Sequence, residues 1–589
     1  MLPKTIVRVF LANTFAILLL ASGGSIPAYA GSSAGAPTAK PVSSNTSAAN
    51  PWWKHAVIYE IYPRSFQDSN GDGIGDLNGI TARLDYLQGL GVNAIWLTPI
   101  YPSPQVDFGY DISNYEAIDP TYGTMADFDR LVAEAKKRNI RVIMDMVMNH
   151  TSDQDPWFIE SRSSRDNPKR DWYVWRDGKG PGQPPNNWES GFGHSAWTYD
   201  AKTQQWYYHH FYPQQPDLNW DNPEVEKAMF NAVRFWLNRG VAGFRLDAIT
   251  TLFEDPQLRD EKVLPGKNAF GDPNESGSMQ SVLPPMHTVL RALRKVTDSY
   301  PGQRVLIGET YMRFQDLVTM YGENDDELQL PMDLRVGFIN KLDVAKFRKR
   351  ISEAENDMHG NQPLFVFDNH DKIRSWNRYG DGVHDAAIAR IVGAILLTTR
   401  STALMYYGEE LGMVTTPPKT RAEVQDPIGK IGWPKEKGRD GERTPMQWTP
   451  GKDAGFSTAA KTWLPVAPDY KLVNVQVESA QPDSLYLWYK KLIAMRRNNP
   501  ALYGGDNIMV NTSDPNVLSY LRKNPGAGPS VLVAMNFTAQ PRKVSFDLKA
   551  QGITGTHART LLQNGGVRER VSLHHVKLPP FAVFIGEVQ

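Results

Sequence analysis

The stretch "GFRLDAIT" at residues 243–250 places two charged residues in a run that otherwise has the composition of a buried β-strand. Successive side chains of a strand point to opposite faces, so Arg245 and Asp247 share one face. In a closed barrel of parallel strands, the carboxyl ends of all strands open on one side, where polar groups gather. Two charges at the end of a buried strand therefore indicate the mouth of a barrel.

Seven further apolar runs accompany this one. They occupy residues 56–66, 93–100, 141–150, 304–310, 326–334, 363–371 and 402–410, and amphipathic helical segments such as 125–138, 223–239 and 286–299 lie between them. This alternation predicts an α/β fold of the (β/α)8 TIM-barrel type. A doubly wound open sheet is the alternative. It is disfavoured because no glycine-rich phosphate turn follows the first run and polar residues end many of the runs.

The amino-terminal fifty residues predict export. Residues 1–30 have a basic start, an apolar run and "AYA" at the end, which is typical of a cleaved signal peptide rather than of a membrane anchor. Residues 31–50, rich in Ser, Ala, Pro and Thr, predict a disordered linker. We therefore expect a periplasmic or secreted protein without a membrane contact after cleavage, and a leader does not distinguish these two locations.

The remaining chain predicts three structural parts. The barrel takes residues 51–150 and 219–504, and the long segment 151–218, rich in Trp, Tyr, Gly, Pro and Asn, predicts an inserted lid, subdomain B, after the third strand. Short alternating strands predict a C-terminal antiparallel β-sandwich domain over residues 505–589. This last domain either supports the barrel or binds carbohydrate.

Composition excludes several classes of partner. The 589 residues include 64 Lys plus Arg and 64 Asp plus Glu, so no net charge attracts nucleic acid or an anionic membrane, and a small neutral substrate is favoured. The absence of cysteine excludes disulfides and thiolate metal sites. No organic cofactor is expected, and the oligomeric state is not indicated.

Acidic residues at neighbouring strand ends predict glycoside chemistry. Asp247 ends the fourth strand, Glu309 ends the fifth, and Asp371 follows the seventh. Any one of them could be a satisfied polar residue that closes the barrel end, but a set at matching positions favours a double-displacement mechanism. The cation of Arg245 suits Asp247 as an ionised nucleophile, whereas Glu309 has no basic neighbour in sequence and suits the protonated acid. Asp371 could hold sugar hydroxyls and favour an oxocarbenium-like transition state.

At these residues the chain resembles the α-amylase superfamily, glycoside hydrolase family thirteen, and within it the α-glucosidase and oligo-1,6-glucosidase group. The four motif regions "DMVMNH", "GFRLDAIT", "IGET" and "FDNHD" occur in order, together with "QPDLNW" at residues 215–220 and "GERTPMQW" at 441–448. The resemblance extends from about residue 52 to the end. It implies that Asp247 is the nucleophile, Glu309 the general acid/base and Asp371 the transition-state stabiliser.

The resemblance also implies a pocket for one terminal glucose, and hence exo-action. The residues that match this pocket are Asp107, Tyr110, His150, Arg245, His370 and Arg443, with Phe192 as a further aromatic wall. Tyr110 could instead be a core residue.

The expected function is a retaining exo-α-glucosidase that hydrolyses short α-glucosides through a covalent β-glucosyl-enzyme intermediate. Ala248 stands where relatives that prefer 1,6-links typically carry valine, so maltose-type α-1,4 links are favoured. A transglucosidase or an isomerase, of the sucrose isomerase or trehalose synthase type, would use the same intermediate and is the alternative. A non-enzymatic binding protein, like the transporter heavy subunits that share this fold, is a third hypothesis.

The stretch "DSNGDGIGD" at residues 68–76 predicts a structural Ca²⁺ site, which the resemblance also implies. Its oxygen donors alternate with glycines, as a loop for a hard cation requires, and would be Asp68, Asn70, Asp72, the carbonyl of Ile74 and Asp76. The loop departs from an EF-hand because Gly79 stands at the twelfth position instead of a bidentate Glu. A loop of Asx turns without a metal is the alternative.

Overall fold

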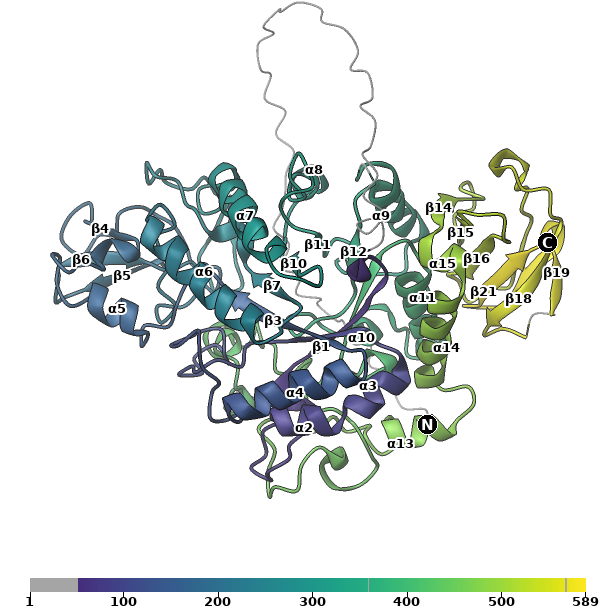
Figure 1. Ribbon diagram of the computed structural model, residues 1–589, viewed down its shortest axis with the longest axis horizontal. Helices are drawn as coiled ribbons and strands as arrows, with labels where there is room; N and C mark the ends of the chain where they lie inside the picture. The colour runs from purple at the N-terminus through teal and green to yellow at the C-terminus, as the bar shows by residue number, and fades with distance from the viewer. Residues whose placement is uncertain (1–50, 359, 567–568) are drawn as a thin grey trace, which may run out of the picture. The chain divides into compact units, whose positions relative to one another are not determined.

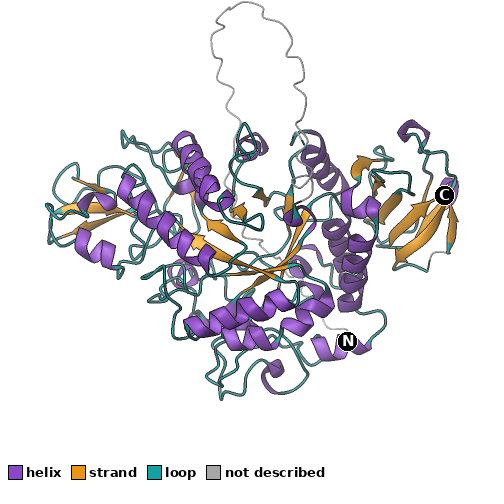
Figure 2. Ribbon diagram, in the orientation of Figure 1, coloured by secondary structure: helices purple, strands orange, loops and turns teal. Residues whose placement is uncertain are grey.

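A computed structural model describes residues 51–589 except 359, 567 and 568. Eight parallel strands close into a barrel in the order β1-β13-β12-β11-β10-β7-β3-β2, so the predicted (β/α)8 fold is confirmed. Figure 2 shows these strands surrounded by helices. The strands are β1 (Val57–Ile61), β2 (Ala94–Leu97), β3 (Arg141–Val147), β7 (Gly243–Asp247), β10 (Val305–Gly308), β11 (Leu330–Asp333), β12 (Leu364–Val366) and β13 (Thr402–Tyr406).

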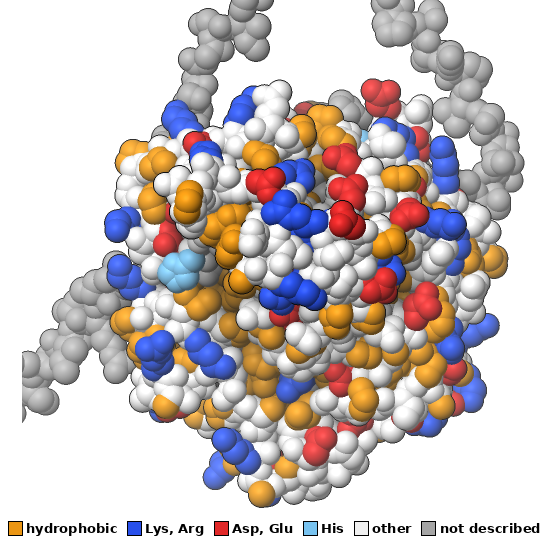
Figure 3. All heavy atoms as spheres, turned by 90° about the vertical axis from the view of Figure 1, so that its left-hand side faces the viewer, with side chains coloured by type: hydrophobic (Ala, Val, Ile, Leu, Met, Phe, Trp, Pro, Cys, Tyr) orange, Lys and Arg blue, Asp and Glu red, His pale blue; other side chains and the backbone are white. Residues whose placement is uncertain are grey.

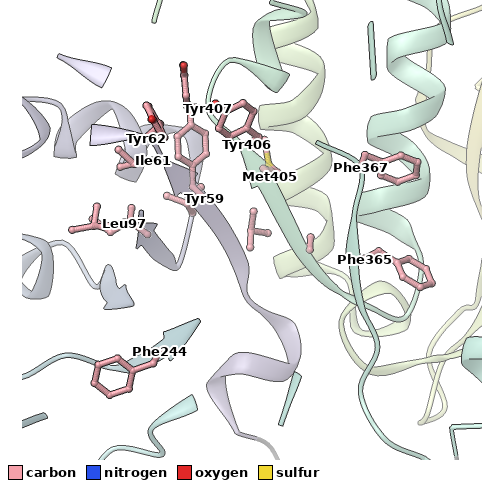
Figure 4. Close-up of a cluster of buried hydrophobic side chains, with 14 of the residues drawn as sticks. Tyr59, Ile61, Tyr62, Leu97, Phe244, Phe365, Phe367, Met405, Tyr406 and Tyr407 are labelled. Atoms are coloured by element: carbon pink, nitrogen blue, oxygen red, sulfur yellow. The ribbon is translucent and has the colours of Figure 1, made fainter. Parts of the chain in front are cut away.

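The barrel strands form because almost every residue in them is buried, on one face or the other. Side chains such as Ile58, Trp96 and Ile307 fill the interior, whereas Tyr59 and Phe244 belong to the larger core between strands and helices. Figure 4 shows part of that outer core, with Tyr59 and Phe244 among its labelled residues. This alternation places Arg245, two residues from Gly243 and one from Phe244, on the interior side of β7.

The covering helices match the predicted amphipathic segments closely. The longer helices are α4 (Met125–Lys137), α6 (Pro223–Asn238), α7 (Leu283–Asp298), α9 (Val344–Asn356), α11 (Asp385–Thr398) and α14 (Leu485–Asn498), and shorter ones include α2 (Leu77–Ala82), α3 (Leu84–Leu90) and α8 (Phe314–Thr319). Thr124 and Asp127 form a capping box that fixes the start of α4. Asn222 caps α6, whose first residue is proline.

The insertion after β3 contains helix α5 (Pro156–Ser161) and a small antiparallel sheet in the order β4-β6-β5. The strands are β4 (Trp175–Arg176), β5 (Trp197–Asp200) and β6 (Gln205–Tyr208), and they surround a separate aromatic core that contains Trp188 and Trp197. Figure 3 looks onto the side of the molecule that includes this insertion, where acidic and basic side chains are interspersed. The predicted lid is therefore a folded subdomain with a core of its own.

The C-terminal part is antiparallel, as predicted. A six-stranded sheet has the order β14-β15-β16-β21-β18-β19, and β17 pairs with β20 in a second, two-stranded sheet. The bounds are β14 (Asp506–Met509), β15 (Val517–Lys523), β16 (Val531–Asn536), β17 (Arg542–Val544), β18 (His557–Gln563), β19 (Arg570–Ser572), β20 (Val576–Leu578) and β21 (Val583–Val588). Both sheets contribute to one apolar core, and the larger sheet packs on α9 and α11 (Figure 1).

Some sequence expectations lie outside the described residues or differ in detail. The predicted signal peptide and linker fall on residues 1–50, which are not described. Among the short alternating runs of the C-terminal part, "KVSFDL" at residues 543–548 is a strand only to Val544. Asp145, in the motif "DMVMNH", lies within β3 rather than after it. No helix in the described part of the chain is long and apolar enough to cross a membrane.

Gly243 gives a direct test of barrel closure. A Cβ built at this residue would lie 2.1 Å from the carbonyl oxygen of Val305 on the neighbouring strand β10, so alanine cannot enter without moving backbone. We expect Gly243→Ala to lower the free energy of unfolding by about 2–4 kcal/mol, measured by chemical denaturation. Gly89→Ala is the matched control. Gly89 is exposed inside α3 with free space around its Cβ, so this change should be neutral or stabilising. Equal stability of the two variants would contradict the close approach of β7 and β10.

Candidate active site

A fully buried guanidinium organises the barrel mouth. Nη1 of Arg245 donates to both carboxylate oxygens of Asp145, at 3.0 and 3.1 Å, and to Oδ1 of Asp247 at 2.5 Å. Its Nη2 lies 2.7 Å from Oε1 of Glu309. Arg245 and Asp145 are register partners on β7 and β3, and Glu309 directly follows β10. One cation therefore joins acidic groups of three adjacent strands, as expected for residues that share the interior face.

Asp247 and Glu309 are close neighbours with opposing influences on their protonation. Burial raises the pKa of Glu309 to about 7, Arg245 opposes the rise, and Asp247 adds to it. Burial also raises the pKa of Asp247, while Arg245 opposes that rise both by its charge and by its hydrogen bond. The backbone N–H of Ala248, which has a left-handed conformation, donates to Oε2 of Glu309 at 3.0 Å. Two acids around one guanidinium readily hold one proton between them.

Glu309 therefore differs from its sequence expectation in one respect. It has no basic neighbour in sequence, but the fold brings Arg245 into contact with it. Its raised pKa results from burial and from the nearby acids, and not from the absence of a cation.

Asp371 has a contrasting environment. Its Oδ1 accepts from Nη2 of Arg443 at 2.8 Å and from Nη1 of Arg439 at 3.2 Å, and its Oδ2 lies 3.4 Å from Nε2 of His370. Although burial disfavours ionisation, these three groups hold the pKa of Asp371 well below its usual range. Its side chain is 23% exposed, more than those of Asp247 and Glu309, so it can meet a ligand while remaining charged.

The fold also brings together the residues predicted to bind sugar. Asp107 pairs with Arg439 at 2.6 Å and accepts from Gln215. The Tyr110 ring stacks on the His370 ring, with centroids 5.4 Å apart. His150 contacts the Tyr110 carbonyl and Gln215 through Nε2, and burial lowers its pKa to about 3.

Phe192 and Arg443 complete this group. The Phe192 ring packs on Phe211 and Tyr212, and the Arg439 guanidinium lies 5.5 Å from its centroid. Arg443 donates through Nε to the His370 carbonyl, at 2.8 Å. All the predicted catalytic and sugar-binding residues thus form one contact network around the mouth. Their contacts with a sugar remain a prediction. Tyr110 is only 5% exposed and packs in the main hydrophobic core.

Arg439 is the main residue that sequence reasoning missed. It forms ion pairs with Asp107, Asp371 and the buried Asp426, and so ties the loop after β2 to the loop after β12. It stands only two residues before the motif "GERTPMQW". The sole available signal was that position, because its partners Asp107 and Asp371 are 332 and 68 residues away.

The loop at residues 68–76 is closed by its own hydrogen bonds. Asp68 accepts from the backbone N–H groups of Asn70, Gly71 and Gly73, and Asp76 accepts from Ser69 and Gly79. A side chain at Gly79 has no room, since its Cβ would lie 1.9 Å from the Gln67 carbonyl oxygen. Over the described residues, no group of three or more His, Cys, Asp or Glu side chains is placed to hold a metal ion. The donor chemistry suits a hard cation, and Ca²⁺ binding stays a prediction.

Comparisons with known proteins agree with this geometry. Residues 60–505 match the family described as "Alpha amylase, catalytic domain". A probable α-glucosidase of Rhizobium meliloti is 40% identical over 553 residues, which cover 91% of this chain and 97% of that protein. An oligo-1,6-glucosidase of Parageobacillus thermoglucosidasius is 37% identical and covers 91% of this chain and 99% of its own length.

Among solved structures, the trehalulose synthase MutB of Pseudomonas mesoacidophila superposes with a TM-score of 0.83 at 35% identity, and covers 92% of this chain and all of its own. The match over most of the chain, together with the ordered carboxylates at the mouth of a closed barrel, shows that this protein is a glycoside hydrolase of the α-amylase family, in its α-glucosidase and oligo-1,6-glucosidase group.

Proposed function

We propose that the protein is a retaining, exo-acting α-glucosidase that hydrolyses short α-glucosides. The observation that carries this proposal is the contact of one buried guanidinium with both Asp247 and Glu309. Two carboxyl groups held by one side chain are close together, and retaining enzymes require a separation of about 5–5.5 Å. Inverting enzymes need a wider gap that admits a water molecule.

The chemical roles follow from position and hydrogen bonding, because burial raises the pKa of both Asp247 and Glu309 to about 7. Asp247, oriented by Nη1 of Arg245, would attack the anomeric carbon while Glu309 gives its proton to the leaving glycosidic oxygen. A water molecule would then lose its proton to Glu309 and attack the same carbon, which releases glucose and restores the Asp247 carboxylate. Asp371 stays ionised beside Arg439 and Arg443, and its charge favours the positive charge that develops on the sugar ring.

Two features support short substrates and α-1,4 links. Arg439 forms ion pairs with both Asp107 and Asp371. By connecting the two loops that carry them, it supports a pocket closed around one terminal glucose. Ala248, directly after Asp247, is the small residue expected with α-1,4 preference, and its N–H contacts Glu309. The names of the relatives include both an α-glucosidase and an oligo-1,6-glucosidase, so the linkage depends on a direct measurement.

Transfer of glucose to a sugar is the second candidate, favoured by the structural likeness to a trehalulose synthase. Residues 252–280 contribute to this question, because they form a hairpin of β8 (Val263–Lys267) and β9 (Pro273–Glu275). The hairpin contacts subdomain B, where Asp272 accepts from the N–H of His194. This contact, two residues from Phe192, supports a role of the hairpin in shaping the space where an acceptor would bind.

The decisive experiment is a proton NMR time course of the protein with maltose, isomaltose and sucrose in separate samples. We expect α-glucose as the first product from maltose, with isomaltose cleaved more slowly. The reducing-end glucose leaves maltose as a mixture of both anomers, so early β-glucose in excess of that mixture would contradict the retaining mechanism. New α-linked sugars as the main products would identify a transferase. Asp247→Asn should reduce turnover at least about 10⁴-fold, since the nucleophile is lost. Wild-type activity in that variant would exclude the assigned nucleophile.

The pH dependence tests the assignment of the acid. The active form needs Glu309 protonated, and burial places its pKa at about 7. We therefore expect kcat/KM for maltose to fall as the pH rises through about 7, because Glu309 loses the proton that the leaving group needs. Profiles for the wild type and Glu309→Gln provide the measurement and its control. With an activated aryl α-glucoside, Glu309→Gln should lack this alkaline limb. The same limb in both proteins would show that another group titrates.

We also propose that the loop at residues 68–76 binds Ca²⁺ for stability, a proposal supported by its oxygen donors. When bound, the ion would tie the loop together. We expect a higher melting temperature in millimolar Ca²⁺ than in EDTA, since a ligand of the folded state stabilises it. Asp72→Ala should abolish this difference, whereas Glu323→Ala, at an exposed acid outside the loop, should retain it. Identical melting temperatures of the wild type in Ca²⁺ and EDTA would contradict the proposal.

A further inference from the structure

Glu60 is a fully buried acid beside the active site to which no step of the proposed mechanism gives a role. It lies on β1, in register with Trp96 of β2 and Tyr406 of β13, and its exposed fraction is 0%. Its side chain shares the interior face of the barrel with Ile58, two residues earlier. A carboxyl group at such a place is costly unless a specific partner compensates it.

The partner of Glu60 is His370, immediately before Asp371. Oε1 of Glu60 lies 2.6 Å from Nδ1 of His370 and accepts from the backbone N–H of the same residue at 3.2 Å. Oε2 is buried and has no hydrogen-bond partner within the described part of the chain. Within the described residues, the Glu60 side chain therefore forms its hydrogen bonds with His370 alone.

The role of Glu60 depends on which protons the other nitrogen of the His370 ring, Nε2, shares with its neighbours. Nε2 of His370 lies 2.7 Å from the Tyr110 hydroxyl, which also lies 3.1 Å from Oδ2 of Asp145. Both oxygens of Asp145 accept from Arg245, so Asp145 acts as a carboxylate. The single phenolic proton of Tyr110 then belongs to the bond with Asp145. Nε2 of His370 must therefore carry a proton, which it donates to the Tyr110 oxygen.

This assignment leaves one proton between Nδ1 of His370 and Glu60. Either Nδ1–H donates to a Glu60 carboxylate, or a Glu60 hydroxyl donates to the unprotonated Nδ1; in both cases the pair has no net charge. Burial raises the pKa of Glu60 and lowers that of His370, so both shifts favour the second arrangement. In either arrangement a proton is kept on Nε2.

We propose that Glu60 is a positioning residue that keeps a proton on Nε2 of His370, so that this ring presents a hydrogen-bond donor to the sugar pocket. The sugar contact itself rests on the proposed α-glucosidase function. The Nε2–H bond holds the Tyr110 oxygen in the unliganded site and is available to a substrate hydroxyl in the complex. Without a partner on Nδ1, only the Tyr110 oxygen would favour a proton on Nε2, and that bond is the one a substrate hydroxyl would replace.

Kinetics of three variants test the role through His370. Glu60→Met keeps the length of the side chain and removes its oxygens, and should lower kcat/KM about tenfold or more. Oε1 of Glu60 makes both contacts with His370, so in Glu60→Gln a small rotation would let the amide N–H donate to Nδ1 while the amide oxygen accepts from the His370 backbone. This variant should recover most of that loss. Because Glu60 acts through His370, Glu60→Met combined with His370→Phe should cost no more than His370→Phe alone. Additive losses, or equal losses in Glu60→Gln and Glu60→Met, would overturn the proposal.

A measurement on the wild type covers the case in which Glu60→Met does not fold. Neutron diffraction from deuterium-exchanged crystals of the whole protein shows which ring nitrogens carry deuterium. The expected result is deuterium on Nε2 of His370 and one deuterium between Nδ1 and Glu60. A bare Nε2 would overturn the proposal. This result does not depend on which glucoside is turned over, so failure of the proposed function would be seen separately, in the product analysis.

Discussion

The contact of the buried Arg245 guanidinium with Asp145, Asp247 and Glu309 is the interaction on which the rest of the site depends. A cation with no exposed surface is tolerable only where acidic groups surround it, and removing one partner leaves an uncompensated charge. The three acids come from β3, β7 and the end of β10, so the same contact that neutralises Arg245 fixes the spacing of three strand ends. Stability of the barrel mouth and geometry of the reacting groups therefore have one origin.

A second set of cations connects the loops above this centre. Arg439 and Arg443 both contact Asp371, and Arg439 continues to Asp107 and Asp426. These ion pairs connect loops that are not joined to one another by hydrogen bonds between strands. Their effect on protonation is opposite to that at Glu309, because the cations outweigh burial at Asp371 and do not at Glu309. The site thus keeps one acid ionised and another protonated within a single network.

How much the sequence could predict depended on the range of each interaction. The eight strands were predictable because burial on both faces leaves continuous apolar runs, and the pair Arg245 and Asp247 because parity alone puts them on one face. Glu60 was missed because its partner His370 is 310 residues away, and Arg439 because its partners Asp107 and Asp371 are 332 and 68 residues away in different loops. The sequence predicts that β7 and β10 are neighbours, but it does not show which side chains meet across them, so the contact of Arg245 with Glu309 was missed.

The charge balance of the mouth also bears on the chemistry. Arg245, Arg439 and Arg443 are the guanidiniums of the network, and they are outnumbered by its carboxyl groups, which are Asp107, Asp145, Asp247, Glu309, Asp371 and Asp426. Burial is the main cause of the raised pKa of Glu309, and the excess of acid adds to it because release of the last proton is unfavourable. The same excess creates a negative potential in a site of low dielectric, where a sugar that gains positive charge at its anomeric carbon is stabilised more than the neutral glucoside that entered. The excess of negative charge helps catalysis because the substrate is neutral and the transition state is positively charged. The attraction between the site and the sugar becomes strong only as that positive charge develops.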